Sequence, residues 1–118
     1  MAKILAVEDE FFVRSLVVET LQDAGHTVLD APDGEEALSI VRSADDIDLI
    51  VTDVRMPRLD GYALARSARD LRPGLAVLFM TGYTGSNPPD GLDSTKTLHK
   101  PFAPEDLVKT VDAILTRR

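Results

Sequence analysis

The sequence predicts an α/β protein in which five parallel strands alternate with five helices, so that helices cover both faces of one sheet. Two observations lead to this prediction. Short, nearly continuous apolar runs recur along the 118 residues, as in strands that are buried on both faces. Between these runs, apolar residues follow helical spacing. No linker or repeat divides the chain, so we expect a single domain over residues 1–118.

The first half of the chain contains three predicted strands and two predicted helices. Strands are expected at residues 3–7, 27–31 and 47–54, each an apolar run that stops near an acid or a turn. Gly25 closes the first helix, and Asp33 caps the second with Glu36 as its capping-box partner. The expected inner faces of these helices are Val13, Leu16, Val17, Leu21 and Ala24, and Ala37, Ile40, Val41 and Ala44.

The second half continues the alternation. Strands are predicted at residues 75–80 and 95–99, and Pro73-Gly74 ends a third helix. Residues 82–92 contain three glycines and two prolines, so a fourth helix there should be short or mobile. Pro104 suits the first position of the last helix. The expected inner faces of the third and last helices are Leu64, Ala65, Ala68 and Leu71, and Leu107, Val108, Val111, Ile114 and Leu115.

Composition and charge exclude several classes of function. The chain has no cysteine, which rules out disulfides, thiolate metal sites and a cysteine nucleophile. His26 and His99 are too far apart to form a helical metal-ligand pair, so zinc is not expected. A net charge of −7 disfavours nucleic-acid binding by this chain alone and suits a divalent cation or a basic partner. We find no membrane span or leader and expect a cytoplasmic monomer.

Polar residues end or directly follow four of the five predicted strands, at the edge of the sheet where α/β proteins bind ligands. They are Glu8-Asp9-Glu10, Asp53, Thr81-Gly82 and Lys100-Pro101. Taken singly, each has an ordinary interpretation as a helix cap, a turn residue or a surface lysine. Crowded carboxylates at Glu8, Asp9 and Asp53 would repel one another unless one takes up a proton or a cation lies between them. A site with few protein ligands and room for a phosphoryl group suits Mg²⁺.

The residue types in this set fit phosphoryl transfer to a carboxylate. Asp53, after an apolar strand, is the best nucleophile candidate and would form an aspartyl phosphate. Magnesium would bridge the carboxylate and phosphoryl oxygens and offset the developing charge. Thr81 could donate a hydrogen bond to one phosphoryl oxygen, and Lys100 could pair with another.

In their order along the chain, these motifs resemble the receiver domain of two-component response regulators over essentially the whole length. The matching pieces are Glu8-Asp9, Asp53 with Met56-Pro57 and Asp60-Gly61, Thr81-Gly82, and Lys100-Pro101-Phe102. The resemblance implies the doubly wound, flavodoxin-like fold with strand order 2-1-3-4-5. It also implies a signalling switch and not an enzyme that acts on a separate substrate.

The resemblance implies a role for each site residue. Asp53 would accept a phosphoryl group from the phosphohistidine of a sensor histidine kinase or a histidine phosphotransfer protein. Magnesium would be held by Asp9, Asp53 and the backbone carbonyl of Arg55, with Glu8 contributing through water. A cis peptide before Pro101 would aim Lys100 at the site. The phosphoryl group would draw Thr81 inward and change a surface that contacts an unknown downstream protein.

Three features depart from the family pattern. Thr97 stands where the family has its switch aromatic, which makes Tyr83 a candidate substitute. The stretch at residues 82–92 indicates an output surface that responds by ordering and not by rotation. Arg55 places a cation by the pocket, where it would tune the lifetime of the phosphoryl group or pair with Glu8 in the empty site.

Alternative functions stay open. The chain could act as a stand-alone phosphoryl shuttle or as the receiver of a hybrid histidine kinase. It could also be a magnesium-dependent phosphatase with an aspartyl phosphate intermediate, although such enzymes usually carry an acid where this chain has Arg55. A degenerate receiver that only binds partners is a further alternative, which the presence of Asp53, Thr81 and Lys100 disfavours.

Overall fold

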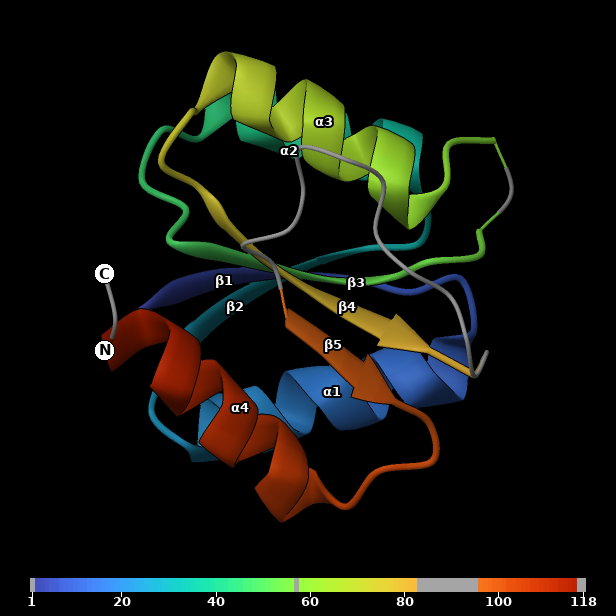
Figure 1. Ribbon diagram of the computed structural model, residues 1–118, viewed down its shortest axis with the longest axis vertical. Coiled ribbons are helices and arrows are strands. Elements are labelled where there is room, and N and C mark those ends of the chain that lie inside the picture. The colour runs from blue at the N-terminus through green and yellow to red at the C-terminus, as the bar shows by residue number, and fades with distance from the viewer. Residues whose placement is uncertain (1, 57, 83–95, 117–118) are drawn as a thin grey trace.

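The computed structural model describes residues 2–56, 58–82 and 96–116, which form one five-stranded sheet with helices on both faces (Figure 1). Neighbouring strands are parallel in the order β2-β1-β3-β4-β5, as predicted. The strands are β1 (Lys3–Val7), β2 (Thr27–Ala31), β3 (Leu49–Asp53), β4 (Ala76–Thr81) and β5 (Lys96–His99). The helices in the described part are α1 (Phe11–Asp23), α2 (Gly34–Ser43), α3 (Gly61–Leu71) and α4 (Pro104–Thr116).

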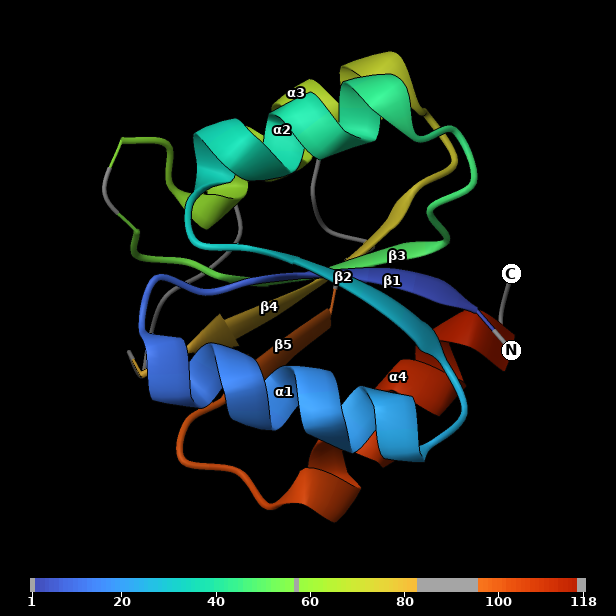
Figure 2. The same ribbon diagram turned by 180° about the vertical axis from the view of Figure 1, so that it is seen from behind.

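The sheet separates two apolar cores. Helices α2 and α3 cover one face, and α1 and α4 cover the other (Figures 1 and 2). Successive side chains of a strand point to opposite faces, so Leu5 and Val7 of β1 belong to the first core while Ile4 and Ala6 belong to the second. This double burial explains why β1, β3 and β4 form nearly continuous apolar runs, whereas the edge strands β2 and β5 also contain polar residues. None of the helices in the described residues is long and apolar enough to cross a bilayer.

Two strands differ from the prediction at both of their ends. The third strand spans Leu49–Asp53 and not residues 47–54. Just before it, the Asp48 N–H donates to the Lys3 carbonyl at 2.8 Å, while the Lys3 N–H donates to the Asp48 carboxylate at 2.9 Å and not to a backbone carbonyl. The fourth strand is shifted by one residue and ends at Thr81, which pairs with His99 of β5. The predicted fourth helix falls mainly on residues 83–95, which lie outside the described residues, as does Tyr83.

The inner face of α1 is narrower than predicted. Val17 and Leu21, four residues apart, are buried, whereas Leu16 is 50% exposed and Ala24 is the exposed C-cap residue. Successive residues of a helix are about 100° apart around its axis, so Leu16 points away from the buried side that carries Val17 and faces solvent. Leu71, the last residue of α3, is likewise partly exposed.

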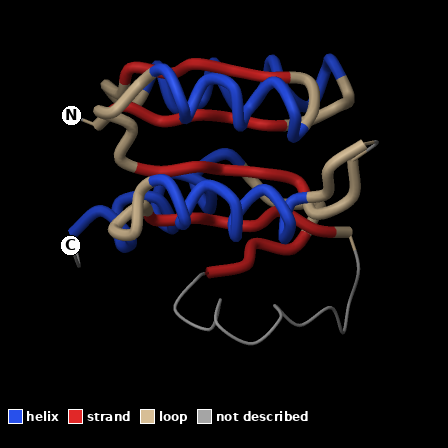
Figure 3. Tube along the Cα trace, turned by 90° about the horizontal axis from the view of Figure 1, so that it is seen from above, coloured by secondary structure: helices blue, strands red, loops and turns tan. Residues whose placement is uncertain are grey.

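Helix N-termini at the same end of the sheet are capped by aspartates. The Asp33 carboxylate accepts the Glu36 N–H at 2.9 Å, as predicted, and the Asp60 carboxylate accepts the Ala63 N–H at 2.8 Å. Figure 3 shows the loops that follow the strands gathered at the end of the sheet that lies away from both chain termini. These caps therefore help to hold the loops that surround the carboxyl ends of the strands.

The Tyr62 side chain packs edge-on against Phe79, with ring centroids 4.8 Å apart. Its hydroxyl is buried and has no hydrogen-bond partner among the described residues. Removing an unsatisfied buried hydroxyl while keeping the ring should stabilise the fold, so Tyr62→Phe is expected to raise the free energy of unfolding by about 1 kcal/mol. Urea unfolding measures this change, and a lower midpoint for the variant would contradict it.

The same substitution should also alter the dependence of stability on pH. Burial, followed by the negative charge of Asp60, raises the pKa of Tyr62 above its ordinary value of 10.0. As the pH rises past that value, the unfolded chain loses the Tyr62 proton while the folded protein keeps it, so stability falls. The advantage of Tyr62→Phe should therefore widen above pH of about 10.

Candidate functional site

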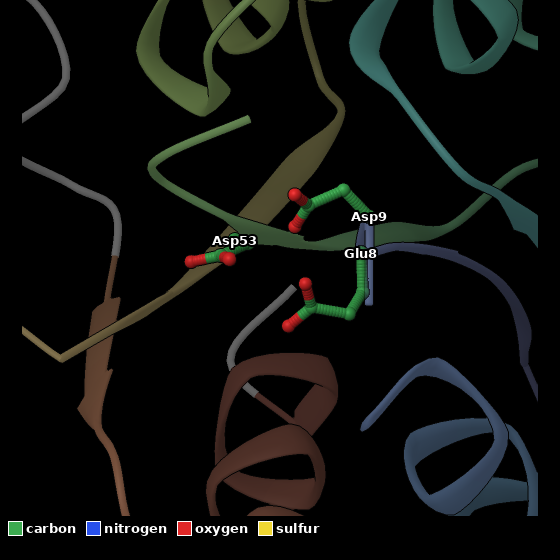
Figure 4. Close-up of side chains that lie close together, drawn as sticks. All are labelled: Glu8, Asp9 and Asp53. Carbon is green, nitrogen blue, oxygen red and sulfur yellow. The ribbon is translucent and has the colours of Figure 1, made fainter. Parts of the chain in front are cut away.

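Three carboxylates meet at the carboxyl ends of β1 and β3. Glu8 and Asp9 directly follow β1, Asp53 ends β3, and one carboxylate oxygen from each lies within 4.8 Å of the others. Figure 4 shows the three side chains close together, with those of Glu8 and Asp9 extending toward the side where Asp53 lies. Glu8 is only 1% exposed, Asp53 is half-buried and Asp9 is exposed. The predicted crowding of acids is therefore present in the fold.

Lys100 lies among these acids. Its Nζ atom is 2.7 Å from Glu8 Oε1 and 3.3 Å from Asp53 Oδ2. The Lys100 backbone N–H donates to the Thr81 carbonyl at 2.8 Å, and the Lys100-Pro101 peptide is cis, as the resemblance implied. From the sequence, proton uptake or a bound cation are the expected ways to relieve the repulsion between Glu8 and Asp53. In the structure, the ammonium group of Lys100 lies against both carboxylates and offsets this repulsion.

The charges shift two pKa values in the cluster. A hydrogen bond with Glu8, then burial and the negative charge of Glu8, raise the pKa of Asp9. Burial opposes the charged form of Lys100, but the hydrogen bond and charge of Glu8, together with Asp53, outweigh burial and raise the pKa of Lys100. Lys100 therefore stays cationic at neutral pH and is available to pair with a second anion.

The backbone around Asp53 is tightly packed. The Asp53 carbonyl accepts a hydrogen bond of 2.9 Å from Thr52 Oγ1, and the Gly61 N–H donates to the Val54 carbonyl at 2.8 Å. A Cβ atom at position 61 would lie only 2.3 Å from the Asp53 carbonyl oxygen, closer than any real Cβ contact. Glycine at position 61 is thus what allows the start of α3 to lie against the Asp53 backbone.

An open pocket of about 450 Å³ lies beside the acids. Asp9, Arg55, Met56 and Asp60 line it, so the exposed Arg55 is placed at the pocket as predicted. The Glu8 carboxylate, with which Arg55 is predicted to pair in the empty site, bonds to Lys100 and accepts the Glu10 N–H, and its pairing with Arg55 stays a prediction. The lining thus combines two acids, Asp9 and Asp60, with the cationic Arg55. The pocket is large enough for a small anion and the water molecules that hydrate it.

Thr81 and Thr97 lie on neighbouring strands of the site. Thr81 ends β4, one residue beyond the Met80 that pairs with Asp53, and its side chain is 1% exposed. Thr97, in the position of the family's switch aromatic, is half-buried in β5. The structure thus brings Glu8, Asp9, Asp53 and Lys100 into one cluster, with Arg55 and Thr81 on the elements beside it.

The donor atoms fit a small, hard divalent cation. Three carboxylates supply oxygen ligands, and Mg²⁺ prefers one or two carboxylates together with water and phosphate oxygens. Such a cation would also relieve the repulsion that raises the pKa of Asp9. The residues that are present therefore fit Mg²⁺.

Sequence reasoning missed Arg14, which contacts the acidic turn. Arg14 Nη1 donates to the Glu8 backbone carbonyl at 2.8 Å, and Arg14 Nε lies 3.1 Å from Asp30 Oδ2. The available signal was a cation one helical turn after the acids that follow the first strand. Spacing along the chain does not show that the Arg14 guanidinium bonds to the backbone carbonyl of Glu8 and not to a carboxylate.

Comparison with known proteins identifies the family. Residues 4–112 match the family described as response regulator receiver domain. The chain is 35% identical to the response regulator receiver protein CpdR of Brucella abortus, over 98% of each chain. It is 36% identical to the sensor kinase CckA of the same organism, over 99% of this chain but 13% of the kinase. The chain therefore spans only a small part of the kinase.

Solved structures agree in fold. The chemotaxis response regulator CheY4 of Vibrio cholerae is 37% identical, with a TM-score of 0.88 over 97% of this chain and 98% of that one. The response regulator protein TrrA of Thermotoga maritima, in complex with Mg²⁺-BeF, is 29% identical, with a TM-score of 0.87 over 97% and 99% of the two chains. With the sheet order, the acidic cluster and the lysine all in place, the chain belongs to the receiver domains of two-component response regulators.

Proposed function

We propose that this receiver domain takes a phosphoryl group on Asp53 from a phosphohistidine, and that this modification switches a surface for protein contact. The donor would be a sensor histidine kinase or a histidine phosphotransfer protein. One observation carries the proposal: the Asp53 carboxylate lies within 4.8 Å of two other carboxylates and 3.3 Å from the Lys100 ammonium. This arrangement supplies a nucleophile, a cation site and a fixed positive charge in one place.

Magnesium is the cofactor that we propose for this site. Asp9, Asp53 and the backbone carbonyl of Arg55 would hold the ion, with Glu8 acting through water. The oxygen donors of the cluster support this assignment, as does the Mg²⁺-BeF complex of the related TrrA. When bound, the ion would offset the negative charge that gathers as a phosphoryl group approaches the acids.

The protein's own groups would carry the transfer. An Asp53 carboxylate oxygen attacks phosphorus, so an O–P bond forms while the N–P bond of the phosphohistidine breaks. The leaving imidazole keeps the electron pair and is protonated. Lys100 would move from its present partners, Glu8 and Asp53, to a phosphoryl oxygen, and the Thr81 hydroxyl would donate to another. Apart from its own phosphorylation and dephosphorylation, the chain would catalyse nothing.

Incubation with a small phosphodonor such as acetyl phosphate tests the proposal. Intact mass should show one added phosphoryl group when Mg²⁺ is present and little or none when it is chelated. Peptide mapping after borohydride reduction should place the group on Asp53. Addition that does not depend on a divalent ion, or that maps to another side chain, would refute the proposal.

The same assay separates the alternative functions. A magnesium-dependent phosphatase would turn over many equivalents of a phosphate ester such as p-nitrophenyl phosphate, whereas a receiver carries one phosphoryl group at a time and accepts another only after the first is lost. A degenerate receiver would show no uptake under any condition. Arg55, which stands where phosphatases of this kind usually have an acid, favours the receiver.

Arg55→Ala is expected to shorten the lifetime of the phosphoryl group. The exposed guanidinium at the pocket would pair with phosphoryl oxygens and screen them from water. Exposed ion pairs contribute about 0.2–1 kcal/mol, so hydrolysis should become about 1.4- to fivefold faster. Decay of the phosphorylated mass after removal of the donor measures the rate, and Arg66→Ala on the exposed side of α3 is the control. An unchanged rate would exclude the tuning role.

A further inference from the structure

We infer that Arg14 is a positioning residue for the acids of the cation site, holding the backbone from which Glu8 and Asp9 project. This inference rests on the proposed function only in taking those acids to bind a divalent ion. Arg14 lies on the first turn of α1, and only 16% of its side chain is exposed. Its role would be to fix where the carboxylates stand and not to touch the ion or the phosphoryl group.

The Arg14 guanidinium contacts three parts of the fold. Nη1 donates to the Glu8 carbonyl at 2.8 Å, just past the end of β1. Nε donates to Asp30 Oδ2 at 3.1 Å, near the end of β2. The Phe11 ring lies against the guanidinium, with its centroid 5.6 Å from the central carbon. Arg14 thus connects the ends of two neighbouring strands to the start of α1.

The contact with the Glu8 carbonyl determines the direction of the following residue. The Glu8 N–H already donates to the Ala31 carbonyl at 3.2 Å, so Arg14 provides the second of two backbone anchors on Glu8. A peptide unit is planar, so the direction of the Glu8 carbonyl also sets the orientation of the Asp9 N–H and the position of the Asp9 Cα. Holding this one oxygen therefore fixes the origin of the Asp9 side chain.

Arginine suits this role better than lysine. The guanidinium presents several N–H groups in a rigid plane, so one side chain reaches both the Glu8 carbonyl and the Asp30 carboxylate. Its flat face can also pack on the Phe11 ring. Lysine at position 14 would keep the positive charge but would lose the fixed angle between the two contacts.

Positioning and charge predict opposite effects on cation binding. A positive charge close to the acids repels Mg²⁺, so its removal by itself should tighten binding. If Arg14 instead holds the acids in place, its removal should weaken binding despite the loss of repulsion. Residues that orient metal ligands typically change metal affinity about 10- to 100-fold when mutated.

Isothermal titration of the metal-free protein with Mg²⁺ tests the inference. Arg14→Met should raise the Kd about tenfold. Arg14→Lys, which retains the charge, should also raise the Kd, because the two-contact geometry is lost. Arg66→Met on the exposed side of α3 removes the same group elsewhere and should leave the Kd unchanged. A Kd for Arg14→Met that is equal to or lower than that of the wild type would overturn the inference.

A second measurement needs no metal. The Glu10 N–H donates to Glu8 Oε2 at 3.2 Å, so its hydrogen exchange reports on order in the acidic turn. Exchange at Glu10 should be faster in Arg14→Met than in Arg66→Met, and equal rates would overturn the inference. If Arg14→Met fails to fold, Asp30→Asn serves instead, because it weakens the hold on Nε while keeping Arg14; it should raise both the exchange rate and the Kd.

The two proposals fail in different ways. A wild-type protein that binds no Mg²⁺ and takes up no phosphoryl group would refute the proposed function. If the wild type binds Mg²⁺ but Arg14→Met has the same Kd, the positioning role alone would be refuted.

Discussion

Asp53→Asn is expected to abolish phosphoryl uptake, by on the order of 10³-fold or more, because the amide oxygen is a far weaker nucleophile than a carboxylate. The side chain keeps its shape, and the amide oxygen can still accept from Lys100, which lies 3.3 Å from the carboxylate in the wild type. The free energy of unfolding should therefore change by less than about 1 kcal/mol. Intact mass after incubation with acetyl phosphate and Mg²⁺ measures uptake, and urea unfolding measures stability.

Asp45→Asn is the matched control for this variant. Asp45 is an exposed acid in the loop that precedes β3, at the end of the sheet opposite the site, so the same chemical change there should leave uptake at the wild-type level. Full uptake by Asp53→Asn would show that another side chain accepts the group. Loss of uptake together with loss of the fold would show that Asp53 is needed for stability and would contradict the expectation that the variant folds normally.

Gly61→Ala is expected to destabilise the fold strongly and to disturb the site at the same time. The added Cβ would lie 2.3 Å from the Asp53 carbonyl oxygen and 3.0 Å from the Val54 Cα. Both neighbours are backbone atoms that cannot rotate away, and the Asp53 carbonyl also accepts a hydrogen bond from Thr52. Overpacking against a fixed neighbour costs roughly 2–3 kcal/mol, which should appear in urea unfolding as a lower midpoint.

Gly74→Ala is the control for the loss of glycine itself. A Cβ at position 74 would meet no atom within 4 Å, so the variant should be as stable as the wild type or about 0.4–1 kcal/mol more stable. Because the Gly61 clash involves the Asp53 backbone, Gly61→Ala should also bind Mg²⁺ more weakly, whereas Gly74→Ala should not. Equal midpoints for the two variants would contradict the close approach at Gly61.

Local patterns explain which parts of the fold could be predicted. The first two strands match the prediction residue for residue. The first is almost wholly buried, and strands buried on both faces form continuous apolar runs. The Asp33 cap was also predictable, because the capping carboxylate and the N–H that donates to it lie within one turn of the chain. Leu16 was assigned wrongly, because helical spacing identifies an apolar face but not how far the packed helix turns it from the sheet.

The sequence by itself determined the fold class, the strand order implied by the family resemblance and the edge of the sheet where polar residues gather. It could do so because alternating patterns and parallel topology bring all carboxyl ends of the strands to one side. Only the tertiary structure decided the partners at that edge: Lys100 bonds to Glu8, 92 positions away, Arg14 bonds to a backbone oxygen, and Gly61 packs on the Asp53 carbonyl. Such contacts depend on distances of a few tenths of an ångström between segments far apart in the chain, which residue types and spacing do not specify.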